Sequence, residues 1–356
     1  MQIPRRQFLT HLGALGLGTL FLPGLAKVVR ADTIAKADFQ QRYPNLLFQP
    51  VESKGLAAFS YLVADTKKGE AVVIDPRRDV ADYRGMAKEN SVTITHVLET
   101  HIHADFLSGA RELAHQTGTA KVAVSAEGGA KYGYTPDRLL RNHDKISVGS
   151  FNLTALHTPG HTPEHMSYLL SEGSQPIALF TGDFLFVGSV GRPDLMGVEN
   201  TERLAKSLFQ TVQHGYQGLP DALPIFPAHG PGSPCGAGIK HSSGQPTLGV
   251  ERATNPYLHL TQESTFIQTL LEAQPPVPYL LAAHERAQCD GAGDTGRHSE
   301  GSRSHSPGTS PADERQDPSG HRHPSTAGLR RRSHPRDGQH WIQSRTVYVG
   351  RLAHQP

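Results

Sequence analysis

The sequence predicts an α/β fold, a layered domain in which short apolar strands alternate with helices. Three observations support this prediction. Short runs rich in Val, Ile, Leu and Phe recur from about residue 43 to residue 280. Helical stretches lie between these runs, and the sequence contains no internal repeat. Only 37% of the residues are hydrophobic, while Gly (36) and Pro (26) are frequent, so part of the 356-residue chain is expected not to pack.

The elements follow from apolar runs and turn residues. The first two strands, 59–64 and 71–75, are joined by the polar turn 65–70, which is typical of a hairpin. Further strands, each a short apolar run, are expected at 94–99, 121–124, 151–156, 166–170, 177–180 and 223–226. Helices are expected at 79–89, 106–116, 201–214 and 262–273. Asp79 is expected to cap the first helix.

The charge and cysteine content exclude several classes of protein. Lys and Arg total 35 and Asp and Glu total 33, so the formal charge of +2 argues against a large basic surface for nucleic acid. The two cysteines, Cys235 and Cys289, exclude a disulfide-rich scaffold and a zinc or iron–sulfur site with four cysteines. The positions of the 21 histidines carry the functional argument.

The N-terminus is typical of a twin-arginine export signal. Arg5 and Arg6 precede an apolar stretch that is short and rich in glycine, and small residues near position 31 offer a cleavage site. We therefore expect residues 1–31 to be a signal peptide that directs the folded protein to the periplasm, with no stable membrane span after cleavage. The alternative is an amphipathic leader on a cytoplasmic protein.

The composition changes abruptly near residues 275–278. From Ala282 to His340, Leu329 is the only Leu, Ile, Val, Phe, Trp or Tyr, and no lysine follows Lys240. Such a segment cannot bury enough apolar area to offset its chain entropy. Residues 282–356 are therefore expected to be a disordered tail or a frame-shifted sequence, which leaves 32–281 as the folded domain.

Four short motifs with metal-ligating side chains follow apolar strands of the expected domain. They are H-I-H-A-D at 101–105, T-P-G-H-T at 158–162, T-G-D at 181–183 and P-A-H-G at 227–230. A single histidine is usually a surface or core residue, but four such motifs at strand ends are hard to obtain by chance. Imidazole nitrogens together with a carboxylate form a site for zinc or for non-haem iron(II), so the motifs predict a metal site.

The order of these motifs resembles the metallo-β-lactamase superfamily, whose members are four-layer αββα sandwiches. Asp75, at the end of the second strand, matches the early structural aspartate of that superfamily. Residues 99–109, G-S-V-G-R-P-D-L at 188–195 and A-H-G-P-G-S-P-C-G-A-G at 228–238 resemble its persulfide dioxygenase branch. That branch is often fused to a rhodanese domain, which is not recognisable here. The resemblance covers about residues 45–280 and implies the αββα fold.

The resemblance also implies the metal and its ligands. Dinuclear zinc members carry a histidine directly after the aspartate of the first motif, where this chain has Phe106, so a mononuclear site is expected. In the persulfide dioxygenase branch the metal is iron(II), and its ligands correspond here to His101, His161 and Asp183. The expected cofactor is therefore one Fe(2+) per chain, with Zn(2+) as the alternative.

The same resemblance implies further site residues. His103, Asp105 and His229 are expected to orient ligands and water around the metal. Arg192 is expected to hold a loop through an ion pair with the aspartate two residues on, the alternative being a surface arginine. Cys235 lies in a loop rich in Gly and Pro and is expected either to face the substrate channel or to be an inert thiol.

The function implied by the resemblance is oxidation of a small thiol persulfide, such as glutathione persulfide, by O2 to give sulfite and the thiol. One alternative is a zinc-dependent hydrolase of the glyoxalase II type, which Phe106 disfavours because a second metal would lack a ligand. Another is an exported, non-catalytic metal-binding protein, which the intact ligand set disfavours. The identity of the thiol and the oligomeric state, a homodimer included, stay open at this point.

Overall fold

The computed structural model describes residues 41–242 and 244–277. The expected signal peptide (1–31) and the expected tail (282–356), with Cys289, lie outside the described residues. Among the helices of the described ranges, none has both the length and the apolar character needed to cross a membrane.

The first sheet contains six strands in the order β1-β2-β3-β4-β5-β6. The strands from β1 to β3 are antiparallel, and those from β3 to β6 are parallel. Their bounds are β1 Leu46–Ser53, β2 Ala58–Asp65, β3 Glu70–Ile74, β4 Thr93–Leu98, β5 Lys121–Ser125 and β6 Arg138–Leu140. Because parallel strands end at one edge of a sheet, the residues after β3 and β4 lie side by side, and the first motif follows β4.

The second sheet has the order β13-β10-β9-β8-β7. Its strands are β7 Lys145–Val148, β8 Phe151–His157, β9 Met166–Glu172, β10 Gln175–Gly182 and β13 Ile225–Pro227. A short hairpin follows β10, with β11 at Leu185–Phe186 and β12 at Ser189–Val190. β8 and β10 are both antiparallel to β9, and β13 is parallel to β10. The other three motifs follow β8, β10 and β13, so they also meet at one edge.

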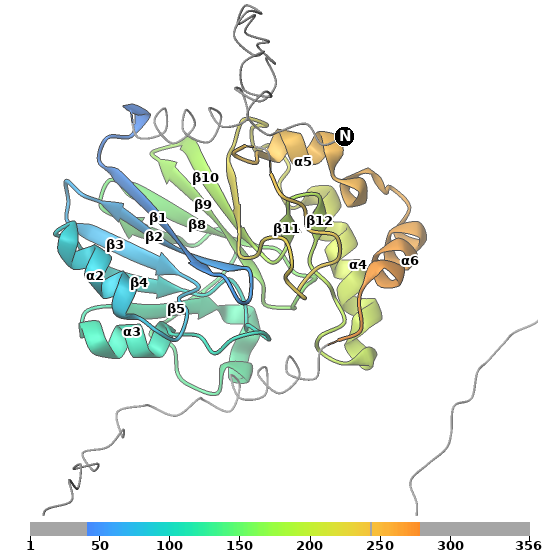
Figure 1. Cartoon of the computed structure of the whole chain (residues 1–356), viewed down its shortest axis with the longest axis horizontal. Helices are drawn as coiled ribbons and strands as arrows, with labels where there is room; N and C mark the ends of the chain where they lie inside the picture. The colour runs from blue at the N-terminus through green and yellow to red at the C-terminus, as the bar shows by residue number, and fades with distance from the viewer. Residues whose placement is uncertain (1–40, 243, 278–356) are drawn as a thin grey trace, which may run out of the picture. The chain divides into compact units, whose positions relative to one another are not determined.

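Helices cover the outer face of each sheet (Figure 1). α2 (Ala81–Glu89) and α3 (Ala110–Thr117) lie on the first sheet, while α4 (Val198–His214), α5 (Leu248–Thr254) and α6 (Glu263–Ala273) lie on the second. Two 3₁₀ segments, η1 at Ala126–Tyr132 and η2 at Pro256–His259, complete the elements of the described residues. The layers are therefore helix, sheet, sheet and helix, which confirms the four-layer αββα fold that the resemblance implies.

Three apolar clusters hold these layers together. The central cluster lies between the sheets and joins Val63 and Ile74 of the first sheet to Tyr168 and Phe180 of the second, all at most 1% exposed. The other clusters lie between each sheet and its helices. Full burial of one such side chain contributes about 1.5–3 kcal/mol, so the sheets form a rigid base for the loops at their edge.

Each predicted strand and helix is present, with its ends shifted by a few residues. The helix expected at 106–116 begins only at Ala110, because the residues before it form a loop. The Ser108 hydroxyl at the end of this loop accepts the Ala110 N–H at 3.0 Å. The predicted cap of α2 is wrong by one residue, since Val80 is the N-cap. Asp79 lies just outside it and accepts the Ala81 N–H at 3.3 Å.

The elements that the sequence did not predict are short or lie at an edge. β1 contains Pro50, which lacks an N–H, but β1 is an edge strand, where one missing donor is tolerated. β6 and β7 have only 3 and 4 residues and pair with longer neighbours. α5 is a 7-residue helix capped by the Thr247 side chain.

Candidate metal centre

Three buried side chains from three strand-end loops converge at the common edge of the two sheets. His101 follows β4, His161 follows β8 and Asp183 follows β10. The Oδ2 atom of Asp183 lies 3.4 Å from His161 Nε2 and 3.7 Å from His101 Nε2. All three side chains are at most 1% exposed. The structure therefore brings together the three ligands that the resemblance implies.

The donor atoms of this group fit a metal ion. Protein ligands bind zinc and similar ions at about 2.0–2.2 Å, which places neighbouring donors about 3–3.5 Å apart. The separation of 3.4 Å falls within that spacing, and the separation of 3.7 Å lies slightly above it. In the described part of the chain, His101 Nε2 and Asp183 Oδ2 are buried without a hydrogen-bond partner. Such atoms are costly in a protein interior, and a bound cation removes that cost. The chain thus contains the residues of a metal-binding site.

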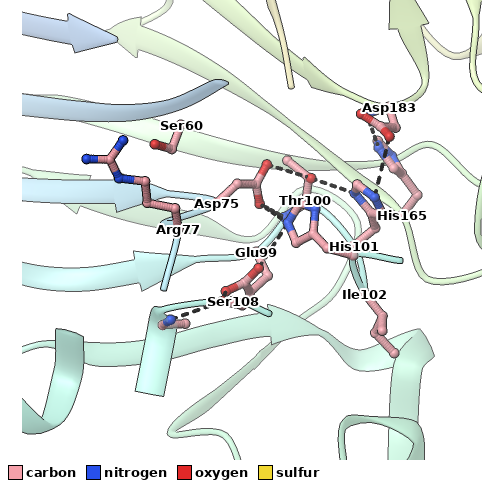
Figure 2. Close-up of polar contacts among 12 residues, drawn as sticks. Ser60, Asp75, Arg77, Glu99, Thr100, His101, Ile102, Ser108, His165 and Asp183 are labelled. Carbon is pink, nitrogen blue, oxygen red and sulfur yellow. Dashed lines mark hydrogen bonds and ion pairs between the residues drawn. The ribbon is translucent and has the colours of Figure 1, made fainter. Parts of the chain in front are cut away.

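A hydrogen-bond relay from Asp75 fixes the orientation of His101 (Figure 2). Asp75 Oδ2 accepts the Thr100 hydroxyl at 2.7 Å, and the Thr100 oxygen lies 2.9 Å from His101 Nδ1. Nδ1 therefore carries the proton, and Nε2 presents its lone pair to Asp183. Asp75 adopts a left-handed φ of 51°, a conformation in which aspartate is enriched relative to most residues, and its Oδ1 accepts the Thr100 N–H at 2.7 Å.

His161 is oriented by the loop that follows β12. Its Nδ1–H donates to the carbonyl oxygen of Arg192 at 2.8 Å, which leaves Nε2 free to bind the metal. The turn before it depends on Gly160, whose φ is +148°. A Cβ at this glycine would lie 2.5 Å from Leu208 Cα, so only glycine lets α4 pack against the loop. Burial lowers the pKa of His161, which keeps its imidazole neutral.

His229 links two buried carboxylates. Its Nδ1 lies 2.7 Å from Asp183 Oδ1, and its Nε2 lies 2.8 Å from Asp105 Oδ2. Burial alone would lower the pKa of His229, but the two carboxylates outweigh burial and raise that pKa to about 10. The imidazolium donates from both nitrogens, and it holds the pKa of Asp183 below its usual range although burial acts in the opposite direction. Asp183 is thus ionised, with Oδ2 left for a metal.

His103 does not join His101 at the metal. Its Nε2 lies 3.2 Å from Asp75 Oδ1 and 3.2 Å from Glu99 Oε2, while its ring centroid lies 4.3 Å from that of His101. Burial lowers the pKa of His103, but these carboxylates raise it well above its usual value. Phe106 packs on the His103 ring with centroids 4.3 Å apart. Where dinuclear relatives are expected to have a metal-binding imidazole, this chain therefore has an apolar ring.

Arg192 is a buried connector and not a surface residue. Its side chain is fully buried, and its guanidinium donates to both carboxylate oxygens of Asp194, at 2.6 and 2.8 Å. This confirms the predicted ion pair. The guanidinium also donates to the carbonyl oxygens of Pro234, at 3.2 Å, and Pro275, at 2.8 Å. The backbone carbonyl of Arg192 also orients His161. Arg192 therefore connects His161 to the loop of Cys235 and to the chain after α6.

Cys235 is buried beside the metal centre. Its sulfur lies within 4.8 Å of one side-chain donor atom each of Asp105 and His229. The thiol is 1% exposed. Burial raises its pKa well above the usual value, and the negative charges of Asp183 and Asp105 add to that effect. The thiol is therefore protonated at neutral pH, which lowers its reactivity, although it lies inside the site.

Several residues of the centre escaped the sequence analysis. Thr100 and Glu99 directly precede the first motif and contact Asp75 and His103, as described above. Glu164 and His165 lie just after the second motif, whose last residue begins the sequence T-P-E-H at 162–165. The Glu164 carboxylate accepts the Ile102 N–H at 3.0 Å and so joins the first and second motifs. The T-P-x-H spacing occurs twice, at 158–161 and at 162–165, and this repetition is the sequence signal that could have identified His165.

The comparison with protein families and curated relatives agrees with this geometry. The model of the metallo-β-lactamase superfamily matches residues 54–233. The chain is 30% identical over 233 residues to the mitochondrial persulfide dioxygenase ETHE1 of Homo sapiens, which covers 65% of this chain and 82% of the relative. It is 32% identical over 180 residues to the cytoplasmic hydroxyacylglutathione hydrolase of Arabidopsis thaliana, which covers 48% of this chain and 63% of that relative.

Solved structures show the same likeness. A metallo-β-lactamase from Staphylococcus aureus subsp. aureus COL superposes with a TM-score of 0.64 at 40% identity, covering 69% of this chain and 73% of the other. ETHE1 from Myxococcus xanthus superposes with a TM-score of 0.57 at 28% identity, covering 68% of this chain and 98% of the other.

Proposed function

The chain belongs to the metallo-β-lactamase superfamily, and from this premise we propose that it is an iron(II)-dependent oxygenase acting on a low-molecular-weight thiol persulfide, such as glutathione persulfide. Membership of this superfamily supports an enzyme, and the matches to persulfide dioxygenases favour this reaction among those of the family. The observation that carries the proposal is a donor set for one metal, formed by His101, His161 and Asp183, with Phe106 in place of a further ligand.

The donor set suits iron(II). Two imidazoles and one carboxylate are the ligand set of non-haem iron oxygenases, and bound iron supplies open coordination positions and redox chemistry that zinc lacks. The net reaction consumes O2, water and the persulfide and yields the thiol, sulfite and two protons, so electrons and atoms balance without another oxidant. The buried thiol of Cys235 lies beside this centre, within 4.8 Å of one side-chain donor atom each of Asp105 and His229.

The protein's own groups hold protons and charge around the metal site. The His229 imidazolium keeps a proton on each nitrogen and neutralises part of the charge of Asp105 and Asp183. The relay from Asp75 through Thr100 keeps a proton on His101 Nδ1. Since these protons are engaged in short buried hydrogen bonds, the ligand atoms stay unprotonated and ready to bind a cation.

Thioester hydrolysis is the second candidate function. The match to a hydroxyacylglutathione hydrolase favours it, as do Asp105 and His229, which lie at the edge of the centre. Against it, His229 uses both ring nitrogens for carboxylates, and Phe106 offers no donor atom. A second zinc would have to break the contacts of His229 and would gain no imidazole at position 106.

Metal analysis of protein purified without oxygen separates these functions. We expect about one iron per chain, because His101, His161 and Asp183 supply the donor set for one metal and Phe106 offers no ligand for a second. The Phe106→His variant is the matched comparison, because it restores an imidazole at the one altered position and should increase the amount of zinc bound. Two equivalents of zinc in the unaltered protein would contradict the proposal.

A further inference from the structure

We propose that His165 is a positioning residue of the metal centre, which sets the places of Asp183 and His101 through one hydrogen bond and one ring contact. The inference rests on the proposed ligand set and is independent of the substrate. His165 is fully buried, and both of its ring nitrogens have protein partners. It therefore offers no atom to a metal and can act only through its neighbours.

The first contact is made to the backbone of Asp183. The Asp183 N–H donates to His165 Nε2 at 2.9 Å (Figure 2). Gly182, just before it, has a φ of +54°, and a Cβ at this position would overlap His165 Nε2. The peptide between Gly182 and Asp183 therefore rests on the imidazole edge. Since His229 holds Oδ1 of the same aspartate at 2.7 Å, Asp183 is fixed at both its backbone and its carboxylate.

The second contact is made to the ring of His101. The two imidazoles stack with centroids 5.2 Å apart and an interplanar angle of 27°. The relay from Asp75 fixes His101 at Nδ1, and the His165 ring supports its face. One side chain thus touches two of the three proposed ligands, which come from different sheets.

A buried chain of hydroxyl groups keeps His165 in the required tautomer. Its Nδ1 lies 2.8 Å from Thr158 Oγ1, which lies 2.9 Å from Ser167 Oγ, which in turn lies 2.7 Å from the Tyr216 hydroxyl. Because Nε2 accepts the Asp183 N–H, the ring proton must be on Nδ1, where Thr158 accepts it. This chain of contacts ties the imidazole to β9 and to the residues that follow α4.

Three substitutions separate the hydrogen bond from the ring contact. His165→Phe keeps an aromatic ring but removes the acceptor for Asp183. His165→Gln places an amide group near the position of Nε2 and restores an acceptor. His165→Asn keeps a polar group near Thr158 but is too short to reach the Asp183 N–H. Loss of a hydrogen-bond partner of a metal-site residue typically costs 10–100-fold in metal affinity.

The experiment titrates the metal-free chain with Co(II) and with anaerobic Fe(II), and records the visible spectrum of the cobalt form. His165→Phe and His165→Asn should bind about 10–100-fold more weakly with a changed cobalt spectrum, whereas His165→Gln should stay closer to wild type than either. Tyr83→Phe is the matched control, because it removes the buried contacts of Tyr83 with Ser60 and Arg77, away from the proposed ligands. It should leave metal affinity unchanged.

The outcomes distinguish this inference from the proposed ligand set. Wild-type affinity and spectrum in both His165→Asn and His165→Phe, with Asp183→Ala losing the metal, would overturn the positioning role. Equal weakening in all three His165 variants would also overturn it, since an acceptor would then make no difference. If Asp183→Ala itself retains the metal, the ligand set is wrong instead. Should His165→Phe not fold, the comparison of His165→Asn with His165→Gln decides the question.

Discussion

Alanine at His101, His161 or Asp183 is expected to abolish oxygen uptake with a persulfide and to remove most of the bound metal. Each side chain supplies one of the three donor atoms, so truncation to alanine leaves only two protein ligands for the metal. Loss of a ligand therefore exceeds the 10–100-fold cost of losing a hydrogen-bond partner of one. Oxygen electrode traces and metal content measure both effects.

The matched control for the histidine variants is His214→Ala, because His214 is exposed at the end of α4. It should keep the metal and the wild-type rate. Asp183→Ala is the most informative variant of the three, since Asp183 is the only carboxylate of the proposed set. Wild-type oxygen consumption in Asp183→Ala would show that the ligands are misassigned.

Replacing Arg192 by alanine is expected to destabilise the protein by about 3 kcal/mol or more, since breaking a buried ion pair by removing one partner typically costs 3–5 kcal/mol. The change leaves Asp194 without its bidentate partner and the carbonyl oxygens of Pro234 and Pro275 without that donor. Metal affinity should fall as well, because the Arg192 carbonyl orients His161. Urea unfolding and metal titration measure the two effects separately.

Arg192→Lys should recover only part of the loss, because a lysine cannot reproduce the planar, bidentate contact with Asp194. Arg203→Ala is the control, since Arg203 is exposed on α4 and its guanidinium contacts the Asn200 side chain. We expect its effect on stability to stay within about 0.5 kcal/mol. An Arg192→Ala variant as stable as Arg203→Ala would show that the buried guanidinium does not hold the loops together.

The strands and the order of the motifs could be predicted because both depend on local sequence. Apolar runs bounded by turn residues mark β2, β4, β8 and β10. A motif follows β4, β8 and β10, and β2 is followed by its hairpin partner β3. Within the second sheet, the motifs follow strands that run parallel to one another. Because parallel strands end at the same edge of a sheet, these motifs lie close together there. The ion pair of Arg192 was also predictable, since the aspartate lies two residues further along the loop.

The orientation of side chains within the centre could not be predicted. His101 and His103 are two residues apart, yet one faces Asp183 and the other faces Asp75 and Glu99. That difference depends on the carboxylates of Asp75, which follows β3, and of Glu99, which follows β4. The role proposed for His165 depends on the close approach of Gly182, which only the packing of β10 against the second motif creates. The predicted signal peptide and tail stay predictions.

The central claim is that the chain oxidises a persulfide at a single iron, and activity measured side by side on two substrates tests it most directly. The iron-loaded protein is supplied with glutathione persulfide in one cell and with an acyl-glutathione thioester in another. The account predicts oxygen uptake that matches the sulfite formed in the first cell, and no release of thiol in the second. Thioester hydrolysis in the second cell, with no oxygen uptake in the first, would contradict it.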